Sequence, residues 1–231
     1  YEGGASGGTL ETMFSMSELD LGDDLTDPFL LNPQDSFTEE QKQLSSDRVG
    51  LANKPEINAW SAPFIMATAN TRVVRRTEAL LALRQESYGA NFTYQEYAFH
   101  KSWFSAFKSL VMTGISVLVL LSPLKKLVKP FLPKPGEGPS ETVQENGWFD
   151  CKFIVETEDG MKSVFNMNGK GDPGYKVTSK LVSECALCLV ENEESLPGGP
   201  GYGGVLTSAS GLGHALISRL SKVGINFNGP L

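Results

Sequence analysis

The chain has 231 residues, of which 40% are hydrophobic and 20% are charged, as in folded globular proteins with one large domain or two small ones. Its 27 acidic residues outnumber its 20 Lys and Arg, which gives a net charge of −7. A phosphate backbone needs a basic face, so we expect no nucleic-acid partner.

The charges are unevenly distributed along the chain. Residues 1–41 contain ten acidic residues and no Lys or Arg, whereas residues 97–136 contain six lysines and no acidic residue. Acidic runs are usually solvated, so we expect an exposed acidic loop at residues 19–41.

The elements predicted before the lysine-rich stretch are a glycine-rich loop at 2–8, a helix at 9–19, a polar, mostly irregular stretch at 20–53, a helix at 63–85 and a strand at 88–99. The helices are predicted from apolar residues three and four positions apart. The strand is predicted from aromatic and polar residues that alternate.

The first loop carries a possible catalytic motif. Gly4-Ala5-Ser6-Gly7-Gly8 matches G-x-S-x-G, the nucleophile elbow of hydrolases. Such a serine needs a histidine as base, and the chain has only His100 and His214. No strand precedes Ser6, so we favour a tight turn or a loop whose backbone approaches a ligand, and keep a serine hydrolase as the alternative.

Three arginines cluster on the helix predicted at 63–85. Arg72, Arg75 and Arg76 could clamp a carboxylate or phosphate through paired hydrogen bonds. A basic helix face that pairs with the acidic N-terminal half explains them equally well, and both interpretations stay open.

Ser109–Leu124 is a run of sixteen residues without charge, with lysines at both ends. Sixteen helical residues rise about 24 Å, less than the roughly 30 Å of a hydrocarbon core. We therefore expect a membrane-associated segment at 101–135 that lies in the bilayer surface. A full span and a buried core helix remain alternatives. The residues expected to contact lipid are Trp103, Phe107, Val117, Leu118, Leu120, Lys125, Lys126 and Lys129.

The remaining elements are an irregular Pro/Gly-rich linker at 133–147, strands at 148–157 and 161–168, a helix at 175–190, a strand at 205–207, a helix at 212–223 and a strand at 225–227. The turn Glu158-Asp159-Gly160 between the first two strands predicts a hairpin. The order of elements predicts an α+β fold in which helices pack on a mixed or antiparallel sheet.

The chain has three cysteines, which suggests a reducing compartment and no disulfide framework. Cys185 and Cys188 match C-x-x-C, but they share a helical stripe with Val177 and Leu181, so we expect them to fill a core, with a redox or metal site as the alternative. Two isolated histidines supply no metal site. Gly169-x-Gly171 and Gly211-x-Gly213 are taken as fragments of nucleotide-binding loops, and neither is expected to bind a dinucleotide.

Several blocks together resemble a known family. SAPFIMATANTRVVRRTEALL and YGANFTYQEY resemble the central region of saccharopine dehydrogenase-like oxidoreductases, the group that includes trans-acting enoyl reductases. GGASGGTLETM, GDPGYKVTSKLV and GGVLTSASGLGHALISRLSKVGINF resemble further elements of that family, in the same order.

The resemblance implies an N-terminal Rossmann domain that is absent from residues 1–231, so that this chain is the C-terminal, substrate-side domain of a longer protein. That domain would bind NAD or NADP and be this chain's partner, and no cofactor is expected on this chain alone. The resemblance also implies an intracellular, membrane-associated location, on a lipid droplet or an organelle membrane. Further partners would be that membrane or lipid droplet surface and other protein subunits.

The implied function is that of the membrane-associated, substrate-side half of an oxidoreductase that acts on a lipid or acyl substrate. The alternative is an enzyme-derived structural or assembly subunit without catalysis. The intact protein would be the enzyme, and this part alone is not expected to be active. We expect Ser6 and Thr9 near the substrate, Arg72 and Arg76 toward an anionic group and Tyr175 at a helix N-terminus, and we assign no catalytic residue.

Overall fold

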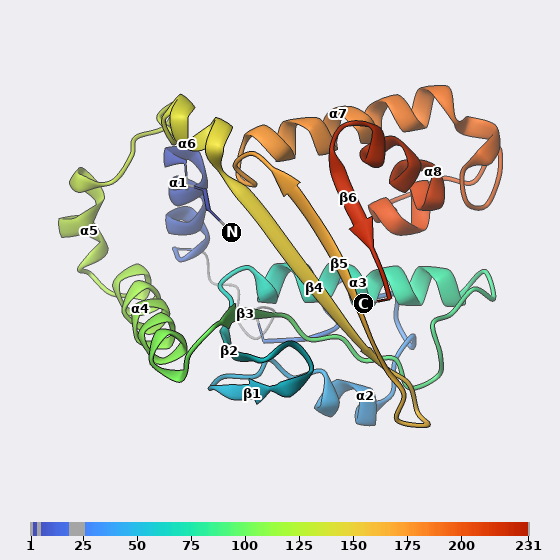
Figure 1. Ribbon diagram of the computed structural model, residues 1–231, viewed down its shortest axis with the longest axis horizontal. Coiled ribbons are helices and arrows are strands. Elements are labelled where there is room, and N and C mark those ends of the chain that lie inside the picture. The colour runs from blue at the N-terminus through green and yellow to red at the C-terminus, as the bar shows by residue number, and fades with distance from the viewer. Residues whose placement is uncertain (1, 4–5, 19–25, 231) are drawn as a thin grey trace. The chain divides into compact units, whose positions relative to one another are not determined.

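A computed structural model describes residues 2–3, 6–18 and 26–230 of the chain (Figure 1). The fold is α+β and divides into two compact units, each with a three-stranded antiparallel sheet. The first unit comprises Tyr1–Met16, Lys129–Gly203 and Gly211–Leu231, and the second comprises Ser17–Val128 and Gly204–Ser210.

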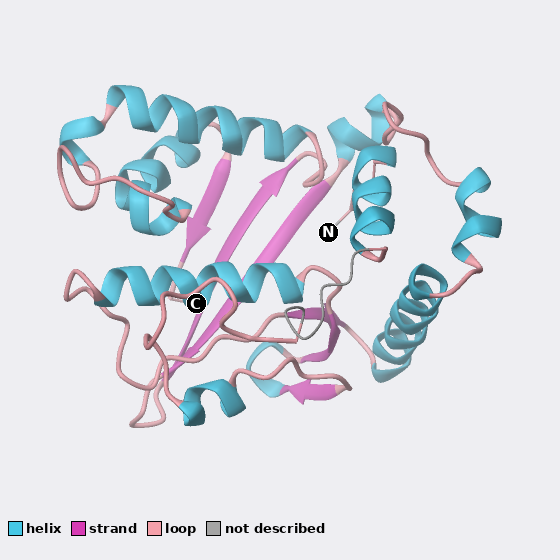
Figure 2. Cartoon of the chain, turned by 180° about the vertical axis from the view of Figure 1, so that it is seen from behind, coloured by secondary structure: helices cyan, strands magenta, loops and turns pink. Residues whose placement is uncertain are grey.

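The first unit is built around the sheet β4-β5-β6. Its elements are α1 (Gly7–Met16), η3 (Lys129–Phe131), α6 (Glu141–Asn146), β4 (Trp148–Glu156), β5 (Lys162–Lys170), α7 (Lys176–Glu191), η4 (Glu193–Ser195), most of α8 (Ser208–Lys222) and β6 (Ile225–Asn228). The predicted hairpin is confirmed, since β4 and β5 pair antiparallel along their whole length. Figure 2 shows these strands in magenta from the opposite side.

Helices α7 and α8 cover one face of this sheet and close the core of the first unit. The buried residues of that core are Phe149, Val177, Cys188, Leu212, Leu216, Leu220 and Ile225. Phe149 lies directly opposite Gly169 on the neighbouring strand, and a Cβ at Gly169 would lie 2.5 Å from the Phe149 ring. Glycine is therefore needed where the aromatic ring crosses β5.

The second unit contains the sheet β1-β2-β3 and the apolar helix. Its elements are α2 (Glu39–Leu44), β1 (Ala52–Lys54), η2 (Pro55–Ile57), β2 (Ala59–Pro63), α3 (Ala67–Ala82), β3 (Tyr97–His100), α4 (Trp103–Leu121) and α5 (Lys125–Val128). Helix α4 begins at the N-cap Ser102, whose hydroxyl accepts a hydrogen bond from Ser105 N–H at 3.2 Å, and it lies against β2.

The strand predicted at 205–207 is wrong, because this segment and the start of α8 are held by side chains of α3 and by Arg84, just after α3, instead of by another strand. Arg76 Nη2 donates to Val205 O at 2.6 Å, and Thr77 Oγ1 lies 2.8 Å from Thr207 Oγ1. Arg84 Nη1 donates to Ser210 O at 2.8 Å. Thr207 N–H donates to Ser210 Oγ at 3.0 Å, so side chains and not a strand ladder bond the backbone at Val205 and Thr207.

Two stretches predicted to be irregular contain short helices with their own caps. Helix α2 lies in the acidic stretch and begins with a capping box, in which Thr38 and Gln41 satisfy each other's backbone N–H groups. Helix α6 lies in the predicted linker and is capped by Ser140. Phe29, in the acidic stretch predicted to be exposed, is buried and stacks on Phe37 at a ring distance of 4.4 Å.

Candidate functional site

Ser6 and Thr9, predicted to lie near a substrate, form the start of α1 in the first unit. Thr9 N–H donates to Ser6 Oγ at 2.8 Å, and Ser6 Oγ donates to Thr9 Oγ1 at 2.9 Å. This is the bonding of a helix N-cap, which satisfies an N–H that the helix leaves unpaired. Ser6 is buried, whereas Thr9 is exposed.

The same geometry gives the hydrolase alternative no support. Gly4 and Ala5 of its motif lie outside the described residues. A nucleophilic serine needs a base at its Oγ, and the Ser6 hydroxyl is bonded to Thr9. Gly7 instead permits close packing: its N–H donates to Glu137 O at 3.0 Å, and a Cβ there would lie 1.8 Å from Lys134 O.

Tyr175 borders the same strip of chain. A Cβ built on Gly138 would lie 3.2 Å from the Tyr175 hydroxyl oxygen, and Gly138 follows the Glu137 that bonds α1. The first unit therefore places the start of α1 and the tyrosine at adjacent positions of one strip. Whether a substrate contacts these residues stays a prediction.

The segment between β5 and α7 contains a motif that the sequence reasoning treated only as a fragment. Gly169-Lys170-Gly171-Asp172-Pro173-Gly174 satisfies G-x-G-x-x-G in full, and it joins a strand to a helix. The amino-acid sequence alone contains the complete motif. The geometry of the loop decides whether it can bind a dinucleotide.

The loop does not fit a pyrophosphate. In a dinucleotide fold the strand is parallel and the helix N-terminus is left free for phosphate. Here β5 pairs antiparallel with both of its neighbours, β4 and β6. The fully buried Asp172 bonds the N–H groups at the start of α7. Tyr175 N–H donates to Asp172 Oδ2 at 2.7 Å, and Val177 N–H donates to the backbone oxygen of Asp172 at 3.0 Å. The protein's own carboxylate occupies the place of the anion.

Arg72 and Arg76 belong to the second unit, where both are engaged by the protein itself. Arg72 is 4% exposed and forms a two-pronged ion pair with Asp47, at 2.6 Å from Nη1 to Oδ1 and 2.8 Å from Nη2 to Oδ2. Arg76 donates to two backbone carbonyls, one of them Val205 O. Of the two interpretations left open, pairing with the acidic N-terminal half agrees with the ion pair between Arg72 and Asp47, and the role toward a substrate stays a prediction.

Arg75 is the most deeply buried arginine of the three. Its guanidinium donates to Pro28 O at 3.0 Å and Tyr94 O at 2.9 Å and lies 5.7 Å from the Phe29 ring centre. Burial, with a smaller contribution from the charge of Arg72, lowers the pKa of Arg75 to about 10. The arginine thus anchors the acidic stretch to α3.

Helix α4 is nineteen residues long, and in the described part of the chain it is the one helix long and apolar enough to cross a membrane. A single residue of it, Ala106, is buried. Large apolar side chains three and four positions apart form an exposed outer stripe of Phe104, Phe107, Val111, Ile115 and Leu118. The sheltered side carries Leu110 together with three small or polar residues, and these four form an inner stripe of Ala106, Ser109, Leu110 and Thr113.

The apolar residues predicted to contact lipid differ in how exposed their side chains are. Trp103, Phe107, Val117 and Leu118 are exposed, and the rings of Trp103 and Phe107 stack 5.2 Å apart. Leu120 is half-buried.

The predicted lysine contacts are partly neutralised. Lys125 Nζ lies 3.3 Å from Glu18 Oε1, and Lys129 Nζ lies 2.8 Å from Glu11 Oε1. Lys126 is exposed, and the residues that the structure describes give it no ion-pair partner.

Two titratable side chains lie at β3: Glu96, which the sequence did not single out, and His100, which it named only as a possible base for Ser6. Burial raises the pKa of Glu96, which accepts a hydrogen bond from Asn70 Nδ2 at 2.9 Å, and its second oxygen is buried without a partner among the described residues. Burial lowers the pKa of His100, whose Nε2 is likewise buried and unpaired within the described chain.

The cysteines agree with a core role. Cys188 is fully buried in the core and Cys185 packs against it, and burial raises the pKa of both thiols, which disfavours the reactive thiolate. Among residues 2–3, 6–18 and 26–230, no three or more His, Cys, Asp or Glu side chains gather closely enough to hold a metal ion.

Comparison of the sequence with known proteins finds relatives that are named trans-acting enoyl reductases. No protein-family model matches the chain, and no solved structure matches it. A protein of Mycobacterium tuberculosis strain H37Rv, provisionally named a trans-acting enoyl reductase, is 36% identical over 98% of this chain and 56% of its own length. Proteins named trans-acting enoyl reductase from Mycobacterium bovis and Mycobacterium ulcerans are each 30% identical, over 87% and 84% of this chain and 49% and 45% of their own lengths.

The chain spans about half the length of the curated relatives it matches. Over 84–98% of its own length the chain is therefore similar to about half of each of these trans-acting enoyl reductases.

Proposed function

We propose that this chain is the substrate-side, membrane-associated part of an NAD(P)-dependent enoyl reductase that acts on a lipid or acyl substrate. The reaction adds a hydride and a proton across a carbon–carbon double bond. The names of the relatives support this class of reaction. Because the glycine loop at 169–174 does not fit a dinucleotide, we place the hydride donor in a domain outside this chain.

Helix α4 is the observation that carries the membrane part of the proposal. A helix of a water-soluble protein turns its large apolar side chains inward and its polar ones outward. In α4 the outer stripe is large and apolar, while Ser109 and Thr113 lie on the sheltered side. Hydrocarbon favours this arrangement, since exposing a contiguous apolar stripe to water costs free energy.

The position of α4 favours insertion parallel to the membrane surface over a full span. Nineteen residues rise about 28 Å, close to the hydrocarbon thickness, so length alone no longer decides. However, α4 lies against β2, and a three-stranded sheet with open edges cannot enter hydrocarbon, where unpaired backbone groups are too costly. The outer stripe would contact acyl chains while the sheet stays in water, so that acyl substrates could pass between the bilayer and the protein.

A non-catalytic membrane-attached subunit is the second candidate. It is supported by the bonding of Ser6, Arg72 and Arg76, whose polar groups are all engaged by the protein itself.

The complete gene product tests the proposal in two assays. With reduced nicotinamide, we expect it to reduce both a short, soluble enoyl thioester and a long-chain one presented in vesicles. Replacement of Phe104, Ile115 and Leu118 with Ser should abolish turnover of the long-chain substrate and leave the short one unaffected. If the triple variant keeps both activities, the membrane role is refuted. If the wild type reduces neither substrate, the non-catalytic subunit is favoured.

A further inference from the structure

The face of the sheet β4-β5-β6 that α7 and α8 leave uncovered is unusually rich in asparagine. Side chains of cross-strand partners point to the same face, as do those two residues apart. Asp150 pairs with Asn168 and Asn168 with Asn226, while Lys152 pairs with Asn166 in the next rung. The polar face therefore consists of Trp148, Asp150, Lys152, Asn166, Asn168, Lys170, Asn226 and Asn228.

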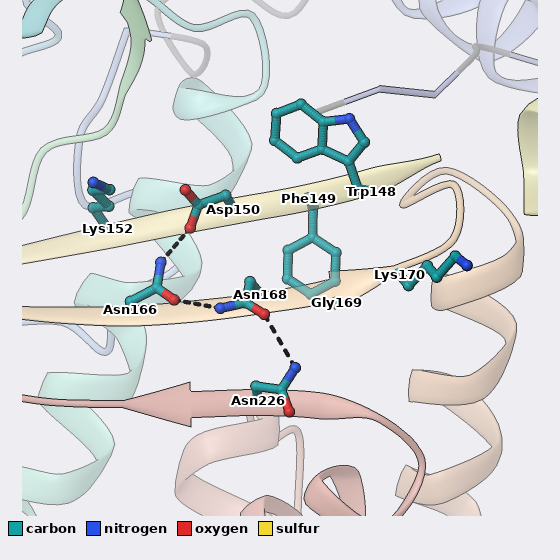
Figure 3. A pocket seen from close by; sticks show the side chains of 9 residues that line it. All are labelled: Trp148, Phe149, Asp150, Lys152, Asn166, Asn168, Gly169, Lys170 and Asn226. Atoms are coloured by element: carbon teal, nitrogen blue, oxygen red, sulfur yellow. Dashed lines mark hydrogen bonds between the residues drawn. The ribbon is translucent and has the colours of Figure 1, made fainter. Parts of the chain in front are cut away.

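Four of these side chains form one hydrogen-bonded row across three strands (Figure 3). Asn226 Nδ2 donates to Asn168 Oδ1 at 3.1 Å, Asn168 donates to Asn166, and Asn166 donates to Asp150. Every amide in the row points the same way, toward the Asp150 carboxylate. The network fixes the orientation of side chains that would otherwise rotate freely in solvent.

The row is not explained by stability. Asparagine is among the residues least suited to a strand, and an exposed sheet face is better served by Thr, Tyr or Val. Asn168 still has hydrogen-bonding capacity, because it uses one of its two N–H groups and one of its two oxygen lone pairs within the row. Asn166 also donates to Cys151 O at 3.3 Å, so it keeps only acceptor capacity at its amide oxygen. The polar face therefore presents donors and acceptors in a fixed alternation.

An open groove of about 600 Å³ runs along this row, and its volume is that of a small-molecule site. Trp148 stands at one end, 46% exposed, with its ring held by a hydrogen bond from Nε1 to Glu2 Oε2 at 3.2 Å. Lys152 and Lys170 line the groove and can donate further hydrogen bonds. The groove combines a flat apolar ring with several fixed donors and acceptors.

We propose that this groove binds a sugar. Neighbouring hydroxyls of a pyranose each donate and accept, which matches the amide row and the Asp150 carboxylate. The apolar C–H face of the same ring can pack on the exposed indole of Trp148. This site lies on a different face of the first unit from the core helices, and it does not depend on the proposed reductase activity.

Saturation-transfer NMR on the intact chain tests the proposal with glucose, galactose, mannose and N-acetylglucosamine, each offered at about 5 mM. We expect transfer to the ring protons of at least one sugar. Asn226→Asp keeps the size of the side chain but removes the donor that starts the row, so affinity should fall about fivefold, the effect of one lost hydrogen bond. Trp148→Ala should abolish binding.

Asn228→Ala is the matched control, because Asn228 lies on the same strand and the same face but outside the groove. It should leave binding unchanged. Absence of transfer to all four sugars would overturn the proposal, as would equal binding by wild type and the Asn226→Asp variant. Shifts at the groove lysines with inorganic phosphate, and none with sugar, would also overturn it.

Discussion

The ion pair between Arg72 and Asp47 separates a structural role of Arg72 from a role in substrate binding. The substitution Arg72→Ala removes both bonds to the carboxylate, a bond from Nε to Asp27 O at 3.2 Å and a bond from Nη1 to Thr71 Oγ1 at 3.1 Å. If the arginine mainly holds the second unit together, the variant loses stability whether or not a substrate is present.

The size of the loss follows from burial. Breaking a fully buried ion pair costs about 3–5 kcal/mol, because the remaining charge is left without a partner. Asp47 is 37% exposed and can regain water, so we expect a loss nearer 3 kcal/mol, which lowers the melting temperature by about 9 °C in a chain of this size.

Urea unfolding followed by circular dichroism measures the loss, and a double-mutant cycle with Asp47→Ala isolates the pair. We expect a coupling energy of about 2 kcal/mol or more. Arg48→Ala, on an exposed neighbour of the pair, should change stability by less than about 0.5 kcal/mol. Unchanged stability together with a raised KM for an anionic substrate would show that Arg72 serves binding and that this reasoning is wrong.

Three further predictions concern packing, pH and charge. Gly7→Ala should cost about 1–3 kcal/mol by forcing the strip at 134–138 off α1, whereas Gly8→Ala, whose Cβ meets only ordinary contacts, should be neutral or stabilising in the same thermal melts. Because the pKa of Glu96 is raised, wild-type stability should fall as pH rises above about 4.5, and Glu96→Gln should remove this slope in urea titrations at pH 4 to 7. Glu11→Gln combined with Glu18→Gln frees two lysines and should strengthen binding to anionic vesicles about 30-fold, at about 1 kcal/mol per lysine; unchanged cosedimentation would contradict this.

Local sequence signals predicted the hairpin and the long helices well. The Asp159-Gly160 turn fixed the β4–β5 pair, and α7 begins within one residue of the expected start. Such features depend on turn chemistry and helical periodicity, which a short window of sequence contains.

The misses depend on contacts between distant residues. Strands β1 and β2 are three and five residues long and carry little periodicity, and the strand expected at 88–99 is confined to Tyr97–His100. The segment at 205–207 is apolar enough for a strand, but its backbone is taken by arginines about 130 residues earlier. A short window of sequence around residues 205–207 cannot indicate a hydrogen-bond partner so far away in the chain.

The sequence predicted which residue types form the candidate site but not which partners they bind. From the sequence we could predict that Arg72 and Arg76 pair with an anion. That Arg72 binds Asp47 and Arg76 binds backbone carbonyls depends on the tertiary structure. The asparagine row could have been noticed from Asn166 and Asn168 two residues apart, but Asn226 joins it only through strand register. The apolar character of α4, in contrast, was expected from composition, but of its outer stripe only Phe107 and Leu118 were named as lipid contacts.

Flotation with lipid vesicles tests most directly whether the outer stripe contacts lipid. We expect the wild type to float with vesicles that contain anionic lipid, and the triple variant Phe104→Ser, Ile115→Ser, Leu118→Ser to bind about 100-fold more weakly, from roughly 1 kcal/mol per half-exposed side chain. A matched triple of exposed apolar residues elsewhere in the second unit, Leu44→Ser, Val49→Ser, Leu83→Ser, should float like the wild type. Equal flotation of wild type and outer-stripe variant, or none by the wild type, would contradict the membrane account.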